Sequence, residues 1–548
     1  MLSVLLLACA PKGPAPLVSA IEVGMPDGIG LAVDVLRPAG GQAAPTVVIQ
    51  TRYWRSIGLK VRQAPGSLPI VPREAIARAL LDAGYNVVVA DVRGTGASAG
   101  DWPAPWSPAE VADGCALLDW VVAQPWSLPQ LATYGTSYEG TSALLAATCG
   151  QPALRAVLAR EIEWDLTAEL LAPGGVANTS FPAIWSAGVD ALDHGGWPDF
   201  FPQGPRRIIA GVRPLDDDPD RSALNARIAA RPPRQVAAAV AGVRRRDDPW
   251  GNTGLRAGDL DPAAHVEALA QSSAAIHIWA GWWDGATADG ALAAAAALPR
   301  ARVAIGAWDH EGEAHSSPLR RRDSEPSTVE LAALVATLDA AVRGAPPPPH
   351  RWYVAGAEGW EQGAALPTTT PQTRFLDDKG ALSPQPTALS ARWEVDFSRG
   401  VGPDSRWTAG VLRPIPPFTR RGEPGSRSWT APAEAAPLRI FGAATLDCAV
   451  QASAGDGALF AYLEHIDKKG RATTLTEGVA RVTGGPLRLS LRAVAAELAA
   501  GEALGLTLTG ADAGTFERLP ASGPNTLSLS GPCALTLPVR AGGSSSSG

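Results

Sequence analysis

The sequence predicts an α/β domain with a mostly parallel sheet, followed by an all-β sandwich domain. Short β-branched runs alternate with helical stretches over residues 18–343, which indicates βαβ units. Four consecutive prolines at 346–349 then mark a stiff linker. After the linker, short strands separated by Gly, Pro and Asp turns continue to about residue 538, as is typical of a β-sandwich.

The first predicted element is a hairpin. Residues 20–23 and 31–36 flank the segment Met-Pro-Asp-Gly at 25–28, whose last three residues favour turns. Further strands are predicted at 46–50, 86–90, 131–134, 154–159, 274–280 and 302–306. Helices are predicted at 73–83, 109–123, 142–147 and 331–342, the second with an apolar face of Val111, Cys115, Leu118 and Val122.

Residues 164–265 interrupt the series of strands. Ala, Arg, Pro and Trp dominate this stretch and strand signals disappear, so we expect a helical cap inserted over the sheet. The first domain is therefore placed at 18–343 and the β domain at 350–540. The tail at 541–548, rich in Ser and Gly, is predicted to be disordered.

Residues 1–17 resemble a signal for export. The apolar run at 2–10 is much shorter than the roughly 18–20 residues that a membrane-spanning helix needs. The segment Leu-Leu-Ala-Cys at 6–9 resembles a bacterial lipobox, in which the cysteine, here Cys9, becomes lipidated. We therefore expect an exported protein, anchored to the membrane as a lipoprotein through Cys9; the alternative is a cytoplasmic protein with an unprocessed apolar end.

Four cysteines remain when Cys9 is set aside. Pairing Cys115 with Cys149 and Cys448 with Cys533 would give two disulfides, each within one predicted domain, and free buried thiols are the alternative. The chain has no Cys-x-x-Cys spacing, so a structural zinc site is not expected.

Composition and charge exclude two broad classes. A hydrophobic content of 46% rules out a disordered chain. The 47 Lys and Arg residues against 54 Asp and Glu residues give a net charge of −7, so nothing points to a nucleic-acid partner.

The sharpest chemical signal is the segment Tyr-Gly-Thr-Ser-Tyr-Glu-Gly at 134–140. It follows a predicted strand and opens a predicted helix, where a tight turn would project the Ser137 hydroxyl clear of the sheet. Gly135 and Gly140 stand where that turn leaves no room for a side chain. Glu139 stands where the common G-x-S-x-G pattern has its second glycine, and the alternative to a nucleophile is an ordinary N-cap serine.

A nucleophilic serine needs a base. His310 follows the predicted strand 302–306, so it would meet Ser137 at the carboxyl edge of the sheet. His315 is a local rival, and His277 lies within a strand and is expected in the core.

The base in turn needs an acid that orients it. Asp284 ends a strand just before a glycine, which suits that role. Asp309 adjoins His310, but neighbours on an extended segment point apart. The resulting order Ser137, Asp284, His310 is that of α/β-hydrolases.

The three residues lie within longer motifs, and further motifs occur elsewhere in the chain. Together they are MPDG at 25–28, TRY at 51–53, DVRGTGAS at 91–98, GTSYEG at 135–140, GWWDG at 281–285, WDH at 308–310, FG at 441–442, YLE at 462–464 and TEGVAR at 476–481. With them, residues 18–540 resemble the cocaine-esterase / X-prolyl dipeptidyl-peptidase family of serine hydrolases, the CocE/NonD type.

This resemblance implies an α/β-hydrolase core, an inserted helical cap and a C-terminal jelly-roll. It also implies an oxyanion hole formed by the backbone N–H of Tyr138 and the hydroxyl of Tyr53, although Tyr53 could instead be a packed aromatic. Both donors must aim at the oxygen that becomes negative during acyl transfer. Such chemistry needs no metal or organic cofactor.

The substrate-binding residues are inferred from the chemistry of the substrates. Trp164 and Trp283 are candidates to line an acyl pocket, or they are ordinary core residues. Peptides and amino esters carry a free ammonium group, which calls for carboxylates near the nucleophile. The candidates are Glu139, Glu161, Glu163 and Asp165, although Glu163 and Asp165 could simply cap the following helix.

The sequence therefore predicts a serine hydrolase that cleaves ester or amide bonds of small molecules or short peptides through an acyl-enzyme on Ser137. An X-Pro dipeptidyl-peptidase or an α-amino-acid ester hydrolase is the alternative, because the elbow GTSYEG resembles the amino-ester hydrolases whereas GWWDG resembles the simple esterases. A non-catalytic scaffold that binds carbohydrate or protein is the remote alternative.

Overall fold

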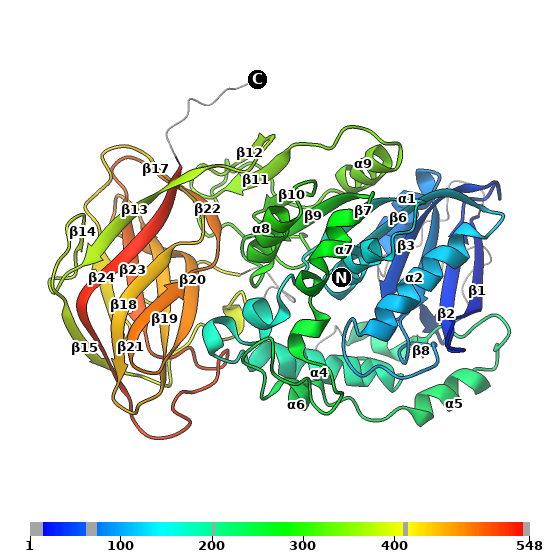
Figure 1. Cartoon of the computed structure of the whole chain (residues 1–548), viewed down its shortest axis with the longest axis horizontal. Coiled ribbons are helices and arrows are strands. Elements are labelled where there is room, and N and C mark those ends of the chain that lie inside the picture. Colours follow the sequence, from blue (N-terminus) through cyan, green and yellow to red (C-terminus); the bar gives the residue numbers. More distant parts are fainter. Residues whose placement is uncertain (1–14, 62–73, 200–202, 409–414, 541–548) are drawn as a thin grey trace.

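The computed structural model describes residues 15–61, 74–199, 203–408 and 415–540 (Figure 1). An α/β body, blue to green in the figure, is built around a ten-stranded sheet, and an all-β body, yellow to red, lies beside it. The predicted fold class, an α/β-hydrolase core followed by a β-sandwich, is therefore confirmed.

The large sheet has the strand order β1-β2-β5-β3-β6-β7-β9-β10-β11-β12. Its pairs from β5 to β11 are parallel, and the pairs at both ends are antiparallel. The central strands are buried almost throughout because helices cover both faces. The strands are β1 Leu17–Gly24, β2 Gly30–Arg37, β3 Ala44–Thr51, β5 Asn86–Asp91, β6 Ser127–Thr136, β7 Leu154–Arg160, β9 Ala275–Gly281, β10 Arg302–Gly306, β11 His350–Val354 and β12 Gly359–Gly363.

Two sets of helices cover the sheet. On one face, α1 Glu74–Asp82 and α9 Leu331–Val342 bury apolar side chains in a common cluster with the strands. On the other face lie α2 Pro108–Val122, α3 Tyr138–Leu145 and α8 Thr287–Ala297.

The buried face of α2 differs from the predicted one. Val111, Cys115 and Val122 are only half-buried, and of the four predicted residues Leu118 alone is fully buried. The helix instead turns Glu110 and Asp113 inward among apolar neighbours. Apolar periodicity missed this face because these two acids find partners inside the protein, which makes their burial tolerable.

The insertion between β7 and β9 is mostly helical, as predicted, but it also contains a strand. Its helices are α4 Ser180–Asp193, α5 Ser222–Ala230, α6 Val236–Val240 and α7 Val266–Gln271. The unpredicted strand β8 Ile209–Val212 pairs antiparallel with β4 Ile57–Leu59 from the core. Four residues are too short a window for periodicity to reveal a strand.

The first two strands after the proline linker belong to the large sheet of the α/β body, not to the predicted β domain. The sequence predicts a β domain over residues 350–540, but β11 joins β10 in parallel and β12 joins β11, so both of these strands extend the large sheet. A stiff linker marks an interruption in the chain, but it does not determine which sheet edge the next strand completes.

The second body consists of two packed sheets. An eight-stranded sheet and a four-stranded sheet, the latter in the order β16-β23-β19-β20, share a core that includes Leu446, Leu463 and Leu506. The strands are β13 Thr369–Leu376, β14 Leu382–Ser383, β15 Ser390–Glu394, β16 Ser426–Thr430, β17 Leu438–Gly442, β18 Thr445–Ala452, β19 Gly457–Ile466, β20 Ala472–Val482, β21 Gly485–Ser490, β22 Val494–Leu498, β23 Ala503–Thr509 and β24 Thr526–Arg540.

Both candidate cysteine pairs form disulfides, Cys115 with Cys149 and Cys448 with Cys533. Cys9 and most of the export-like segment lie outside the described residues, as does the tail at 541–548. Within the described ranges, no helix is both long enough and apolar enough to cross a membrane.

Candidate active site

Ser137 occupies a tight turn between β6 and α3. Its backbone has φ 62° and ψ −128°, a conformation that L-residues rarely adopt. A Cβ atom on Gly135 would lie 2.1 Å from the Glu139 backbone, and one on Gly140 would lie 2.2 Å from the Arg160 carbonyl oxygen. Only glycine fits at these two positions, so the sequence around Ser137 is what allows the turn.

Asp284 and His310 lie together at the carboxyl edge of the same sheet. Asp284 follows β9, His310 follows β10, and these two strands are direct neighbours. The Nδ1 atom of His310 lies 2.9 Å from Asp284 Oδ1 and 3.0 Å from Oδ2. The carboxylate thereby fixes the imidazole tautomer and leaves Nε2 to face a substrate.

Arg160, the last residue of β7, connects the serine turn to the histidine loop. Its Nη1 donates to Thr136 Oγ1 at 3.2 Å and its Nη2 donates to the Glu311 carbonyl at 2.8 Å. Its own carbonyl accepts from the Ser137 N–H at 2.9 Å. In the described structure no hydrogen bond joins the Ser137 hydroxyl to His310, a contact that commonly tightens only when substrate binds.

Opposing effects set the basicity of His310. Burial lowers its pKa, but attraction and hydrogen bonding to Asp284, with smaller contributions from Glu311 and Glu163, raise the pKa to about 9. The imidazolium that forms during acyl transfer is therefore well stabilised.

Tyr53 and Tyr138 are the two candidate oxyanion donors. The Tyr53 hydroxyl accepts a 2.9 Å hydrogen bond from Trp185 Nε1, and burial raises its pKa well above the ordinary value. Within the described chain, the Tyr53 proton has no acceptor and so is available to a ligand. Tyr138 is the first residue of α3, where a backbone N–H lacks an intrahelical acceptor.

An aromatic and acidic cluster holds the Tyr138 side chain. Its hydroxyl donates to Glu110 at 2.6 Å and accepts from Trp102 Nε1 at 3.0 Å, and its carbonyl accepts from Trp106 Nε1. The Tyr53 ring meets the Tyr138 ring edge-on at 6.1 Å. Burial raises the pKa of Glu110 to about 7. Sequence reasoning missed Glu110, because an acid at a helix start normally caps the helix.

Glu163 and Asp165, two of the candidate substrate-binding acids, take different positions. Glu163 is buried and accepts from Thr141 Oγ1 at 3.0 Å; burial raises its pKa to about 7, against an opposing contribution from His310. Asp165 caps the next turn through the Ala168 N–H, which was the stated alternative.

Both tryptophans are core residues in this structure. Trp164 is packed in the main cluster, and Trp283 donates its indole N–H to the Leu475 carbonyl of the β-sandwich at 3.0 Å. The structure thus gives both a packing role, and the pocket-lining role stays a prediction.

The rival residues have other partners. His277 is buried within β9, and burial together with Arg302 lowers its pKa to about 4. His315 lies 3.5 Å from Glu358 through Nε2. Asp309 accepts from the Ala314 N–H instead of contacting a histidine.

The β-sandwich supports the turn that carries Asp284, a feature that the sequence did not reveal. Arg406 Nη1 donates to the Trp282 carbonyl at 3.1 Å, and the Gly285 N–H donates to the Arg406 carbonyl at 3.2 Å. Arg406 Nε also pairs with Glu477 at 2.9 Å.

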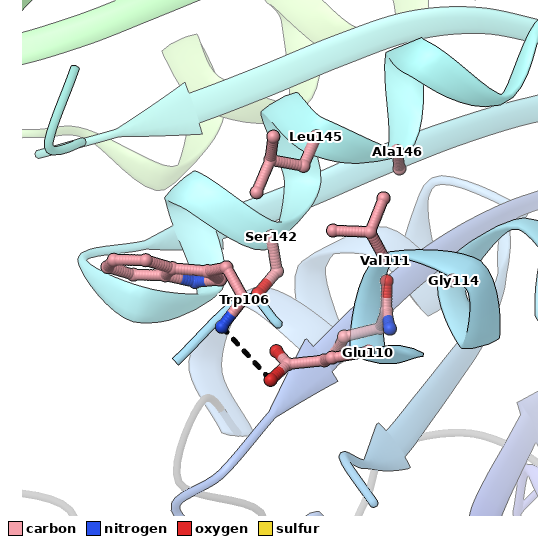
Figure 2. A pocket seen from close by; sticks show the side chains of 8 residues that line it. Trp106, Glu110, Val111, Gly114, Ser142, Leu145 and Ala146 are labelled. Carbon is pink, nitrogen blue, oxygen red and sulfur yellow. Dashed lines mark hydrogen bonds between the residues drawn. The ribbon is translucent and has the colours of Figure 1, made fainter. Parts of the chain in front are cut away.

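A small hollow lies between α2 and α3, and none of the three candidate catalytic residues is among the residues that line it (Figure 2). Trp106, Glu110, Ser142 and Leu145 are among the residues that line it. The Ser142 hydroxyl donates to the Tyr138 carbonyl one turn back in α3. We assign no substrate to this hollow.

Comparison with known families gives two matches along the chain. Residues 27–312 match the family described as X-Pro dipeptidyl-peptidase (S15 family). Residues 344–542 match the family described as X-Pro dipeptidyl-peptidase C-terminal non-catalytic domain.

Two curated proteins show similarity over most of the chain. A Mycobacterium bovis protein, provisionally named a serine esterase, is 29% identical over 505 residues, which cover 84% of this chain and 80% of that protein. The cocaine esterase of Rhodococcus sp. is 25% identical over 391 residues, which cover 67% of this chain and 63% of that enzyme.

Solved structures of the same fold cover nearly the whole chain. An α-amino acid ester hydrolase superposes with a TM-score of 0.74 at 19% identity, covering 97% of this chain and 98% of that one. An aminopeptidase from a marine sediment Thaumarchaeota archaeon superposes with a TM-score of 0.73 at 17% identity, covering 98% and 99%. At these identities the likeness concerns the fold alone.

Proposed function

Because the chain belongs to the S15 family of X-Pro dipeptidyl-peptidases and is a serine hydrolase, we propose that it cleaves ester or amide bonds through an acyl-enzyme on Ser137. The observation that carries this proposal is the His310–Asp284 hydrogen bond at the sheet edge where Ser137 occupies its strained turn. A strained serine at the same sheet edge as an oriented base is the arrangement that nucleophilic acyl transfer requires.

The mechanism follows from these positions. Ser137 Oγ attacks the carbonyl carbon of the substrate while His310 Nε2 takes the hydroxyl proton, and the carbonyl oxygen becomes negative. Tyr53 O–H and Tyr138 N–H donate hydrogen bonds to that oxygen. The imidazolium, stabilised by Asp284, gives its proton to the leaving alcohol or amine as the bond to it breaks.

Hydrolysis of the acyl-enzyme repeats the sequence with water. His310 removes a proton from water as the oxygen attacks the acyl carbon, and it then returns the proton to Ser137 Oγ as the acid leaves.

Glu163 supports a second candidate, in which the preferred substrates carry an α-ammonium group. Its carboxylate is buried, is fixed by Thr141 one turn after Ser137, and acts electrostatically on both His310 and Tyr53. An ammonium group bound there would compensate a buried charge that no Lys or Arg pairs with in the described chain.

Turnover of two substrate series separates these candidates. p-Nitrophenyl acyl esters are compared with amino-acid esters and X-Pro-p-nitroanilides, using Ser137→Ala as the inactive variant and Ser142→Ala as the matched control in the same helix region. Preference for uncharged esters favours a general ester hydrolase, and preference for a free α-amine favours the amino-ester or dipeptidyl activity. Turnover that survives in Ser137→Ala would rule out the proposed nucleophile.

We also propose that the protein is exported to an oxidising compartment, with Cys9 as a lipid anchor. The two disulfides support export, because such bonds persist mainly outside the cytosol. Fractionation of cells that produce the native chain and Cys9→Ala tests both parts: the proposal expects the native chain in the membrane fraction and the variant released from it.

A further inference from the structure

Glu161 is a buried acid that the proposed mechanism does not use. It follows β7 directly, at the same sheet edge as the candidate catalytic residues, and its side chain is fully buried. Its backbone has φ 50°, a strained value for a residue with a side chain, and its N–H donates to the Trp279 carbonyl at 2.7 Å. Strain of this kind concentrates at functional sites.

The Glu161 carboxyl points toward Asp284. Its Oε2 accepts from the Gly281 N–H at 2.9 Å and from the Thr287 hydroxyl at 3.2 Å. The Thr287 hydroxyl lies equally close, 3.2 Å, to Asp284 Oδ2. A hydroxyl has one proton, so Thr287 cannot satisfy both carboxyls at once.

The shared Thr287 hydroxyl, 3.2 Å from an oxygen of each acid, places the two carboxyls side by side. A bond between them needs a proton, because ionised carboxylates only accept. The Glu161 Oε1 atom meets no hydrogen-bond donor among the described residues, which leaves it free to carry that proton.

The surroundings determine which acid holds the proton. Asp284 faces His310, where a negative charge is stabilised and needed. Among the described residues, the one cation that lies near the Glu161 carboxyl is Arg160, at 4.0 Å, and its guanidinium also donates to Thr136 and Glu311. Burial and Asp284 raise the pKa of Glu161 well above its ordinary value.

We propose that Glu161 is a positioning residue for the reaction: as a neutral carboxylic acid, it donates a hydrogen bond to the Asp284 carboxylate and so fixes the acid that orients His310. This proposal rests on the proposed acyl-enzyme mechanism. Besides Asp284 and His310, the charged and titratable groups near this pair in the described structure include Arg160, Glu163, Asp309, Glu311 and, from the β-sandwich, Arg406.

Two substitutions test the proposal. Glu161→Gln keeps an acceptor for Gly281 and a donor for Asp284, so it mimics the neutral acid. Glu161→Leu removes the donor. The control is Glu169→Leu, since Glu169 is another buried acid, bonded to the Trp164 N–H and without contact to Asp284.

Ester turnover is measured against pH, together with the low-field proton resonance of the His310–Asp284 hydrogen bond. Glu161→Gln should keep the wild-type kcat, pH profile and resonance. Glu161→Leu should lower kcat by about tenfold or more, because it removes a hydrogen bond to a charged group. KM should stay unchanged, and the proton resonance should shift. Glu169→Leu should keep kcat and the resonance.

Two results would overturn the proposal. In one, the acid limb of the Glu161→Gln profile moves to lower pH, which would mean that wild-type Glu161 is charged. In the other, Glu161→Leu folds and keeps the wild-type kcat. Where Glu161→Leu does not fold, the Glu161→Gln profile alone decides. If the wild-type chain itself shows no turnover that depends on Ser137, the proposed function has failed, not this inference.

Discussion

Replacing Tyr53 by Phe tests the side-chain half of the oxyanion hole. The Trp185 indole fixes the Tyr53 oxygen at 2.9 Å, and the phenol stays protonated because burial raises its pKa. The hydroxyl can therefore donate to a developing oxyanion across the whole working pH range. Removing one such donor costs about 10²–10³ in kcat, or about 2.7–4 kcal/mol.

The substitution also has a structural cost that must be separated from the catalytic one. Tyr53→Phe leaves the Trp185 N–H without its acceptor, which costs about 1–3 kcal/mol of folding free energy. Tyr85→Phe is the matched control, because the hydroxyl of Tyr85, a residue between α1 and β5, donates to Asp339 of α9 at 2.8 Å.

The assay is steady-state turnover of a p-nitrophenyl ester, with thermal unfolding measured on the same samples. Tyr53→Phe should lower kcat by the stated factor with little change in KM, whereas Tyr85→Phe should lower only stability. A fall in kcat of less than about threefold in folded Tyr53→Phe would refute the reasoning, since one lost donor should cost far more.

Two further predictions concern the groups around the triad. Glu163→Gln removes a negative charge that raises the pKa of His310. Because His310 acts as a base only above its pKa, the acid limb of kcat/KM should move to lower pH. The expected shift is about half a pH unit, which is less than the 1–3 units that a directly adjacent charge causes. An acid limb that stays in place or moves upward would contradict this. Arg406→Met should lower kcat because it releases the turn of Asp284, and should also cost about 3–5 kcal/mol of stability by leaving buried Glu477 without its partner. Adding Glu477→Gln should restore the melting temperature but not kcat, and full recovery of kcat would assign Arg406 a purely structural role.

The sequence was sufficient to place the candidate catalytic residues at one edge of the sheet. Ser137, Asp284 and His310 each follow a buried strand, and parallel strands bring their carboxyl ends to a common edge. Local pattern and chain order therefore carry this information, without any knowledge of tertiary contacts.

The supporting contacts could not be predicted in the same way. Arg406 reaches the Asp284 turn from the β-sandwich, 124 positions away from Trp282, and Glu161 meets Thr287 across 126 positions. Periodicity reports on which face of an element is buried, not on which distant residue fills a polar gap. The sequence did place Glu161 at the correct edge, but as a candidate for binding an ammonium group.

The same limit explains the errors in the fold. The four residues of β8 form a strand by pairing with β4, and β11 joins the large sheet by pairing with β10. Both outcomes depend on open strand edges elsewhere in the molecule. The inward acids of α2 depend on partners from other elements, such as Tyr138 for Glu110.

Trapping the acyl-enzyme tests the central claim most directly. The wild-type chain and Ser137→Ala are mixed with a p-nitrophenyl ester, quenched in acid during turnover, and analysed by intact mass and peptide mapping. The account predicts one added acyl group on the peptide that carries Ser137, and none in the variant. An acyl group on another residue, or equal turnover by Ser137→Ala, would contradict it.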